Sequence, residues 1–325
     1  MNDVIKITLV FAVLAALVPA LVFIGRDKPE GSQVSAVPAS GRTVRVLSES
    51  TGKTADYDET EFIALSLMAQ ISESYEDEAI KAQAVLIRTY LERRRRAEKE
   101  SPTKELKGAL VSDNRQKYQS FFTKAQAKKY FGKDFENVFS RLCRLTADTK
   151  TEVLLYDGEP VLPAYHAVSC GVTRSAADAW GQDIPYLVSV KSPQDNKSPD
   201  YEAVITLTVG ELQKKLEKAF PDIDFSKAEK KTLTELETDK NGIISKALVC
   251  GNEVSSGELC AALGLSSPCA EVKYKSGKFT FTTHGLGHLV GLSLYGANAM
   301  AHDGKDHRDI LEYYFKGAKV EQKAP

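Results

Sequence analysis

The stretch that most constrains this chain's fold is residues 74–98. Its apolar side chains recur three or four positions apart, at Ile80, Ala84, Ile87 and Leu91. That spacing places them on one face of an α-helix, so a long helix with one buried face is predicted. Ser74 is the expected N-cap residue. The arginine run 93–96 near the helix end suits the negative end of the helix dipole, or alternatively a phosphate-rich polymer.

Length and charge narrow the classes of protein. The 325 residues allow one large domain or two modest ones. A formal net charge of −1 gives no overall field that would attract nucleic acid, so no nucleic-acid partner is expected. Five cysteines are too few for a disulfide scaffold, and the odd number leaves at least one unpaired. A disulfide among Cys250, Cys260 and Cys269 is left open.

The N-terminus carries an uncharged apolar run of 19 residues, from Ile7 to Gly25. This is close to the ~20 residues that cross a bilayer core. It exceeds the roughly 7–15 apolar residues of a cleavable signal peptide. We therefore predict a short N-terminus at 1–6 and an uncleaved single-pass anchor at 7–25. Residues 26–41, rich in Pro, Ser and Gly, are expected to form a flexible linker.

The rest of the chain, residues 42–320, is predicted to be one folded domain of the α+β class. Asp58 and Glu61 have the spacing of a capping box, which indicates a helix running to about Ile71. The dipeptide Asp157-Gly158 indicates a hairpin turn. Strands and helices do not alternate regularly, so a parallel doubly wound sheet is excluded. We expect helices in the N-terminal part and largely antiparallel strands from about residue 151 to 282.

Three segments carry a resemblance to a known family. The run EAIKAQAVLIRTY, residues 78–90, resembles the hallmark helix of the stage II sporulation protein D family, which includes the LytB amidase enhancers. A second segment is similar to the family's His-Ser-Thr-Ser-Gly-Gly-x-Thr motif through His166, Ser169, Gly171 and Thr173, with Trp180-Gly181 downstream. A third is similar to Gly-His-Gly-x-Gly-x-Ser-Gln-Tyr-Gly-Ala through Gly287, His288, Gly291, Ser293, Tyr295, Gly296 and Ala297. The resemblance runs from about residue 44 to 317.

This resemblance implies action on the glycan strands of peptidoglycan, with most of the chain outside the cytoplasm. Enzymes of the family, lytic transglycosylases, carry a catalytic glutamate eight residues before the position of Glu78, where this chain has Gln70. An amide has no titratable proton to protonate a leaving oxygen, although it can hydrogen-bond a sugar. Glu73 and Glu76 are nearby acids that would substitute if the loop shifts. Two alternatives follow: a glycan-binding protein or scaffold for a partner cell-wall hydrolase, and an active enzyme using an acid such as Glu73.

The resemblance also implies further site residues. Lys81 is expected near the catalytic position, or as an exposed cation. The substrate-binding residues it implies are Arg88, Tyr90, His166, Ser169, Thr173, Trp180, His288, Ser293 and Tyr295. Trp180 would form either a sugar platform or part of the core. His166 and His288 are expected to converge on one cleft.

A zinc site is a further alternative. Cys170 follows His166 by four positions, and both side-chain types bind zinc. Together with His288 they would supply three ligands. No cofactor is otherwise expected. The partners expected from the resemblance and from the N-terminal run are glycan strands, cell-wall hydrolases and a membrane.

Overall fold

The computed structural model describes residues 39–226 and 232–323. The predicted anchor and most of the predicted linker lie outside these residues. Within the described part of the chain, no helix has the length and apolar character needed to cross a membrane. The folded range forms two compact units. The first comprises the chain up to Ala164 together with Ala297 onward, and the second is Tyr165–Gly296.

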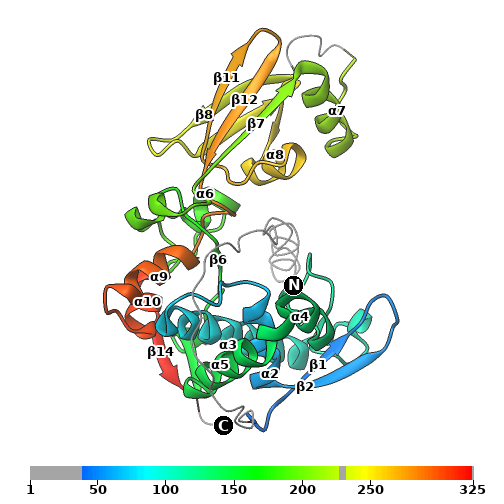
Figure 1. Ribbon diagram of the computed structural model, residues 1–325. Helices are drawn as coiled ribbons and strands as arrows, with labels where there is room; N and C mark the ends of the chain where they lie inside the picture. The colour runs from blue at the N-terminus through cyan, green and yellow to red at the C-terminus, as the bar shows by residue number, and fades with distance from the viewer. Residues whose placement is uncertain (1–38, 227–231, 324–325) are drawn as a thin grey trace. The chain divides into compact units, whose positions relative to one another are not determined.

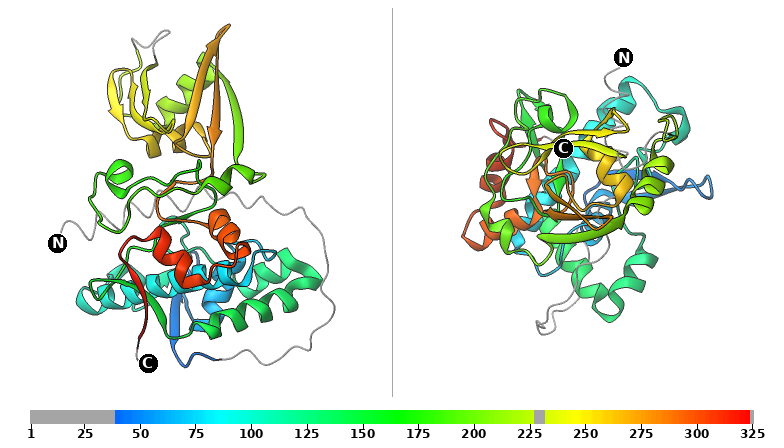
Figure 2. Two further views of the ribbon diagram at one scale, coloured as in Figure 1. Left: turned by 90° about the vertical axis from the view of Figure 1, so that its left-hand side faces the viewer. Right: turned by 90° about the horizontal axis from the view of Figure 1, so that it is seen from above.

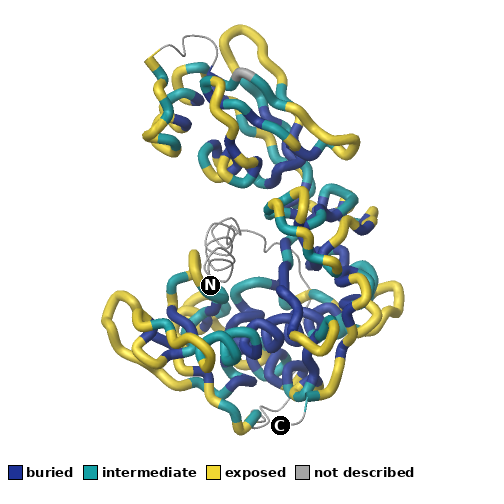
Figure 3. The backbone as a smooth tube through the Cα atoms, turned by 180° about the vertical axis from the view of Figure 1, so that it is seen from behind, coloured by how far each residue is buried: buried dark blue, intermediate teal, exposed yellow. Residues whose placement is uncertain are grey.

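The first unit is built around the predicted long helix. Its helices are α2 (Glu59–Met68), α3 (Asp77–Glu100), α4 (Lys124–Phe131), α5 (Phe135–Asp148) and α10 (His307–Tyr314), with short 3-10 turns at Lys104–Leu106 and Gly132–Asp134. Helix α3 contacts α2, α5 and α10, and Figure 1 shows α2, α3 and α5 packed together. Its predicted apolar residues, Ile80, Ala84, Ile87 and Leu91, are each at most 1% exposed. The buried centre of the unit appears dark blue in Figure 3.

Helix α3 begins two residues later than its sequence indicated. Its N-cap is Glu76, whose side chain makes no capping hydrogen bond. The prediction that Ser74 is the N-cap is wrong, because other side chains hydrogen-bond to the backbone of the loop before the helix. Arg141 donates to the carbonyl oxygens of Glu73 and of Tyr75, and Asn298 accepts from the Glu76 N–H at 2.8 Å. Asp58 is the N-cap of α2 as predicted, since its side chain accepts from the Thr60 N–H at 2.9 Å, but the predicted reciprocal partner Glu61 pairs with Lys124 instead.

Two small sheets complete the first unit. Strands β1 (Thr43–Leu47) and β2 (Thr54–Asp58) pair antiparallel, and β3 (Val111–Ser112) pairs parallel with β1. The second sheet has the order β14 (Lys319–Gln322), β4 (Glu152–Tyr156), β5 (Glu159–Pro160), all antiparallel. Asp157 and Gly158 join β4 to β5 with φ of 50° and 76°. Positive φ at both central positions is the geometry that the Asp-Gly pair predicted.

The second unit contains three sheets and three helices among its described residues. Strand β6 (Tyr165–His166) pairs parallel with β13 (Leu292–Ser293). The other sheets are β8 (Leu233–Thr238), β9 (Ile244–Val249) and β10 (Asn252–Val254), and β7 (Glu202–Thr208), β12 (Lys278–His284) and β11 (Ala270–Lys275). The helices are α6 (Ala176–Trp180), α7 (Val209–Ala219) and α8 (Ser256–Leu263), with a 3-10 turn at Pro193–Lys197; helix α9 (Leu294–His302) begins at the end of this unit.

One apolar core joins the two larger sheets of this unit to α7 and α8, through residues such as Leu212, Val249, Leu259 and Phe281. Figure 2 shows its yellow strands, β8 to β10, beside the orange strands β11 and β12. All the pairs in these two sheets are antiparallel. The predicted α+β class with largely antiparallel strands is therefore confirmed.

Candidate functional site

Gln70, the residue at the predicted acid position, lies just after α2 and is half-buried. Its Nε2 donates to the carbonyl oxygen of Ser120 at 2.7 Å. Its Oε1 accepts from Nε2 of the buried Gln83 on α3 at 2.8 Å. These two bonds define the orientation of the amide. Because the Ser120 oxygen requires a donor, a carboxyl group placed here would be favoured in its protonated form.

Three buried polar atoms around Gln70 have no hydrogen-bond partner among the described residues. They are Oε1 of Gln83, Nε2 of Gln119 and Oε2 of Glu73. Gln83 bonds directly to Gln70, and Gln119 precedes Ser120 in the chain. Buried polar atoms are normally paired, so these three atoms leave hydrogen-bonding capacity unused within the fold.

The loop that contains Glu73 is fixed by hydrogen bonds to its backbone. Arg141 on α5 donates to the Glu73 carbonyl and, at 2.8 Å, to that of Tyr75. The same guanidinium donates to Oδ1 of Asp77 at 3.1 Å from Nε. The loop shift that would bring Glu73 to the Gln70 position would break these bonds. If Glu73 acts as an acid, it must do so from where it lies.

An aromatic surface lies near Glu73 and was not predicted. Tyr130 on α4 is 44% exposed, with its ring centroid 5.6 Å from that of Phe122 and 4.9 Å from that of Phe131. Burial raises the pKa of Tyr130, and the charge of Glu73 raises it further. Exposed aromatic faces of this kind suit the apolar face of a sugar ring.

Lys81 is bound within the fold. Its Nζ lies 2.8 Å from Oε1 of Glu78 and 3.9 Å from Oδ2 of Asp148. The other oxygen of Glu78 accepts from both the backbone N–H and Nδ1 of His307, at 2.9 and 2.7 Å. Burial by itself would raise the pKa of Glu78, but the bonds from Lys81 and His307 outweigh it and lower that pKa to about 2. Glu78, the first residue of the hallmark motif, therefore ties α3 to α10.

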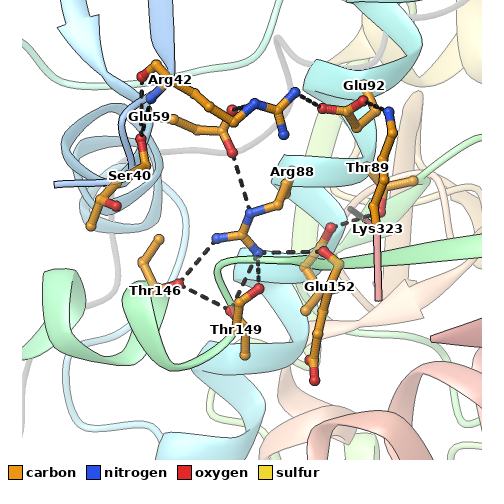
Figure 4. Close-up of polar contacts among 12 residues, drawn as sticks. Ser40, Arg42, Glu59, Arg88, Thr89, Glu92, Thr146, Thr149, Glu152 and Lys323 are labelled. Carbon is orange, nitrogen blue, oxygen red and sulfur yellow. Dashed lines mark hydrogen bonds and ion pairs between the residues drawn. The ribbon is translucent and has the colours of Figure 1, made fainter. Parts of the chain in front are cut away.

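Arg88 is buried beneath the surface, with 2% of the residue exposed. Figure 4 shows its guanidinium against the end of α5, where it donates to the carbonyl oxygens of Thr149 at 2.7 Å and of Thr146 at 3.0 Å. Its Nε pairs with the equally buried Glu59 at 3.3 Å. Arg95 also pairs with Glu59, at 2.7 Å. Arg88 thus neutralises a buried carboxylate, and its burial does not support the predicted contact with substrate.

Tyr90 is likewise buried, at 8% exposure, and its hydroxyl accepts from the Gln119 N–H at 3.4 Å. A direct contact with substrate is therefore unsupported for this side chain too. The arginine run is also used internally. Arg93 donates to the Pro160 carbonyl at 2.7 Å, Arg94 pairs with Glu98 at 2.5 Å, and Arg96 pairs with Glu159. These pairings leave the phosphate-binding alternative without support.

In the second unit, the two remaining motifs meet on one buried carboxylate. Asp195 is 0% exposed, and its Oδ2 accepts from the Ser169 N–H at 2.9 Å. Burial raises the pKa of Asp195, although the hydroxyls of Ser169 and Ser293 hydrogen-bond to it and oppose that rise. Ser169 and Ser293 are both 0% exposed, so they join loops rather than face solvent. Asp195 was missed because an isolated aspartate looks the same in sequence whether it is buried or solvated.

The rings of His166 and His288 converge as predicted, with centroids 5.9 Å apart, and the cleft that they were expected to line stays a prediction. Trp180 is half-buried, with its ring 5.6 Å from that of His288. Burial, helped by the neighbouring His288, lowers the pKa of His166 to about 3, and burial lowers that of His288 to about 4. Both rings are therefore neutral at pH 7. Gly287 permits the approach, because an added Cβ would lie 2.9 Å from the His166 Cβ.

The side chains that were predicted to bind zinc are partly engaged in other hydrogen bonds. Nδ1 of His288 accepts from the Val290 N–H at 3.1 Å, and the ring also hydrogen-bonds to the Tyr165 backbone. Across residues 39–226 and 232–323, no three His, Cys, Asp or Glu side chains are grouped to hold a metal ion. Zinc binding by His166, Cys170 and His288 stays a prediction, which metal analysis of the purified protein would test.

Two further motif residues take part in hydrogen bonds with backbone groups. Oγ1 of Thr173 accepts from the Val190 N–H at 2.9 Å, and the residue is 1% exposed. Tyr295 is half-buried, and its N–H donates to the Ala167 carbonyl at 3.0 Å. Leu294, which stands where the family motif has glutamine, is 4% exposed.

Comparison with known proteins identifies the family. The family model described as Stage II sporulation protein matches residues 48–156, which include Gln70 and all of α3. Stage II sporulation protein D of Bacillus subtilis (strain 168) is 32% identical, over 91% of this chain and 83% of its own length. The chain belongs to the stage II sporulation protein D family.

Two other relatives extend this result. Stage II sporulation protein D of Bacillus amyloliquefaciens is 30% identical, over 95% of this chain and 93% of its own length. The Amidase enhancer of Bacillus subtilis (strain 168) is 25% identical over 76% of this chain, but only 38% of that protein is covered. Membership of the stage II sporulation protein D family therefore applies to nearly the whole chain, including both units.

Proposed function

We propose that this protein binds peptidoglycan glycan strands outside the cytoplasm, anchored by residues 7–25, and cleaves them poorly or not at all. The observation that carries the proposal is Gln70, which occupies the family's acid position with its amide hydrogen-bonded on both sides. Glycoside cleavage needs a group that protonates the leaving oxygen, and this side chain holds no such proton.

Binding is supported by the surroundings of Gln70. Gln70 is only half-buried, and its amide can hydrogen-bond the hydroxyl and acetamido groups of a sugar. Tyr130 adds an exposed ring on which a sugar can stack. None of these contacts depends on a catalytic proton, so binding persists without cleavage.

The test uses the full-length protein and purified wall glycan. Sedimentation with the glycan measures binding, and chromatography of the soluble fraction measures anhydro-muramyl products. We expect retention on the glycan with trace product only. Rapid release of anhydro-muramyl products by the unmodified protein would overturn the proposal.

An active lytic transglycosylase using Glu73 is the second candidate. It is favoured by one observation, the buried and unpaired Oε2 of Glu73. If this candidate is correct, the unmodified protein cleaves glycan and Glu73→Gln abolishes the activity. Glu76→Gln is the matched control, because Glu76 is an exposed carboxylate three residues away.

A scaffold for a cell-wall hydrolase is a further candidate, suggested by the relative named Amidase enhancer. Such a protein would increase the activity of an added wall amidase without forming anhydro-muramyl products itself. Measuring amidase turnover with and without this protein distinguishes the scaffold from simple glycan binding, which leaves the turnover unchanged.

A further inference from the structure

Two cysteines that lie 99 positions apart meet in the second unit. Cys269 precedes β11 closely and is 5% exposed, in a cluster with Ile243 and Leu289. Cys170, in the loop after His166, packs against this cluster and is half-buried. The Cys269 and Cys170 side chains hydrogen-bond to each other.

One segment of backbone positions both cysteines. The His284 N–H donates to the Cys269 carbonyl at 2.8 Å. The next residue, Gly285, has a φ of +86°, and a Cβ added to it would lie 3.1 Å from the Cys170 nitrogen. The two thiols are therefore held by the same close-packed segment rather than by independent loops.

The other three cysteines have different surroundings. Cys143 is on α5 in the first unit, and Cys260 is 2% exposed in the core around α8. The sulfur of Cys250 lies 3.9 Å from the Thr232 carbonyl oxygen. All five cysteines lie within the described residues, and Cys170 with Cys269 is the pair whose side chains are hydrogen-bonded to each other.

The two sulfurs differ in their exposure. Cys269 is buried and Cys170 is half-buried, so Cys170 is the more accessible of the two. The Cys170 thiol donates to the Val172 carbonyl oxygen at 3.5 Å, and the Cys269 thiol donates to that of Asn241 at 3.4 Å. An external disulfide therefore reaches Cys170 first, and the thiolate is the form that attacks it.

We propose that Cys170 and Cys269 form a disulfide bond by exchange with a disulfide donor, either an oxidised low-molecular-weight thiol or a disulfide oxidoreductase. The Cys170 thiolate attacks the donor and releases one donor thiol, leaving a mixed disulfide. Cys269 then loses its proton and attacks the Cys170 sulfur, releasing the second donor thiol. The two cysteines are oxidised, the donor disulfide is reduced, and both protons end on the donor thiols.

The bond would link the loop after His166 covalently to the residue that directly precedes β11. It would also close a long loop in the unfolded chain, which disfavours unfolding. The proposal needs an oxidising location, as expected outside the cytoplasm, but not glycan binding or cleavage. Failure of the proposed function would therefore leave it standing.

The test counts free thiols in the full-length protein. The protein is first equilibrated with oxidised glutathione. It is then denatured in the presence of a metal chelator, and its free thiols are alkylated without prior reduction. The mass of the intact protein gives the number of alkylated cysteines. Five cysteines less one bonded pair leave three alkylated positions, and prior reduction restores five. We expect Cys170→Ser to give four alkylated positions, because it frees Cys269. The control Cys250→Ser should give two, because the pair remains bonded.

Two results would overturn the proposal. Five alkylated positions in the unmodified protein would show that both thiols stay free or had held a metal that the chelator removed. Two alkylated positions in the Cys170→Ser protein, where four are expected, would assign the bond to another pair. A melting temperature that is higher for the oxidised than for the reduced protein, and a difference lost in Cys170→Ser, would support the bond independently.

Discussion

The Gln70 side chain makes the two hydrogen bonds that a protonated carboxyl group would make in the same place. It donates to Ser120 and accepts from Gln83. An acid and its amide have nearly the same shape, so the exchange removes a proton while preserving the local packing. An amide nitrogen in place of a carboxyl oxygen at residue 70 would therefore allow glycan binding but not acid-catalysed cleavage.

The first prediction concerns restored acidity. Gln70→Glu should increase anhydro-muramyl release by about 10²-fold or more, because general acid catalysis typically contributes 10²- to 10⁴-fold. Product release from wall glycan is the measurement. Gln126→Glu is the matched control, since Gln126 is exposed on α4 and its capping oxygen is kept. Equal product from both variants would show that position 70 is not the acid position.

The second prediction concerns glycan binding by Tyr130. Tyr130→Ala should weaken binding to wall glycan by roughly 2- to 10-fold, the range expected for one aromatic contact. Tyr274→Ala is the control, because Tyr274 is 57% exposed in the other unit. Co-sedimentation at several glycan concentrations measures both. If only the control variant binds glycan more weakly, the binding surface includes Tyr274 rather than Tyr130.

The third prediction concerns the buried Arg88. Arg88→Met should lower the free energy of unfolding by about 3–5 kcal/mol, because it removes the donor to the Thr146 and Thr149 carbonyl oxygens and one of the cations paired with the buried Glu59. Arg96→Met, on the same helix but with a 41% exposed side chain, should cost about 0–1 kcal/mol. Urea unfolding measures both. Similar losses in the two variants would contradict a structural role that is specific to Arg88.

Among the elements, α3 is joined to α10 and β4 by one histidine. His307 bridges Glu78 through Nδ1 and Glu152 through Nε2, each at 2.7 Å. Two carboxylates can both accept from this ring only when it is protonated. Burial alone would lower the pKa of His307, but the hydrogen bonds to Glu152 and Glu78 outweigh it, and the pKa is raised.

The fourth prediction is the resulting pH dependence. Because the folded-state pKa of His307 is raised, its stabilising effect is complete below the unfolded value of about 6.5 and is lost as pH rises through the folded pKa. Glu78 acts in the opposite sense. Its lowered pKa stabilises the fold above the unfolded value of about 4.3 and that effect is lost as pH falls towards 2.

Urea unfolding across this pH range tests the bridge. His307→Gln should be most destabilising below pH 6.5, and the difference from the unmodified protein should shrink at higher pH. His302→Gln is the control, because His302 lies at the end of α9 with a 78% exposed side chain. A loss of stability in His307→Gln that does not vary with pH would contradict the bridge.

For the whole molecule, the N-terminal run is the predicted membrane anchor. The fifth prediction is that residues 7–25 keep the full-length protein in the membrane pellet after an alkaline carbonate wash, since 19 apolar residues are close to a bilayer span. Recovery of a shortened soluble chain beginning near Arg26 would indicate a cleaved signal peptide instead. Replacing Val13 and Leu17 by Asp should release the protein from the pellet, as charges at a span's centre oppose insertion.

Sequence alone determined the features that depend on near neighbours. The buried face of α3 followed from residues three and four positions apart, and the β4–β5 turn followed from the Asp157-Gly158 pair. The Gln70 substitution was also visible, because counting back from Glu78 needs only chain positions. These inferences succeed since helical periodicity and turn geometry are local properties of the backbone.

Tertiary structure decided what depends on distant partners. Arg88 finds its carbonyl acceptor 61 positions away and Ser169 its carboxylate 26 positions away, so neither role is written in the local pattern. The start of α3 was set by distant side chains: Asn298 accepts from the Glu76 N–H, a group that Ser74 would have capped, and Arg141 fixes the loop by donating to the Tyr75 carbonyl oxygen. Burial changes a polar side chain from a surface group into one that must be paired, and only the folded chain determines which groups are buried.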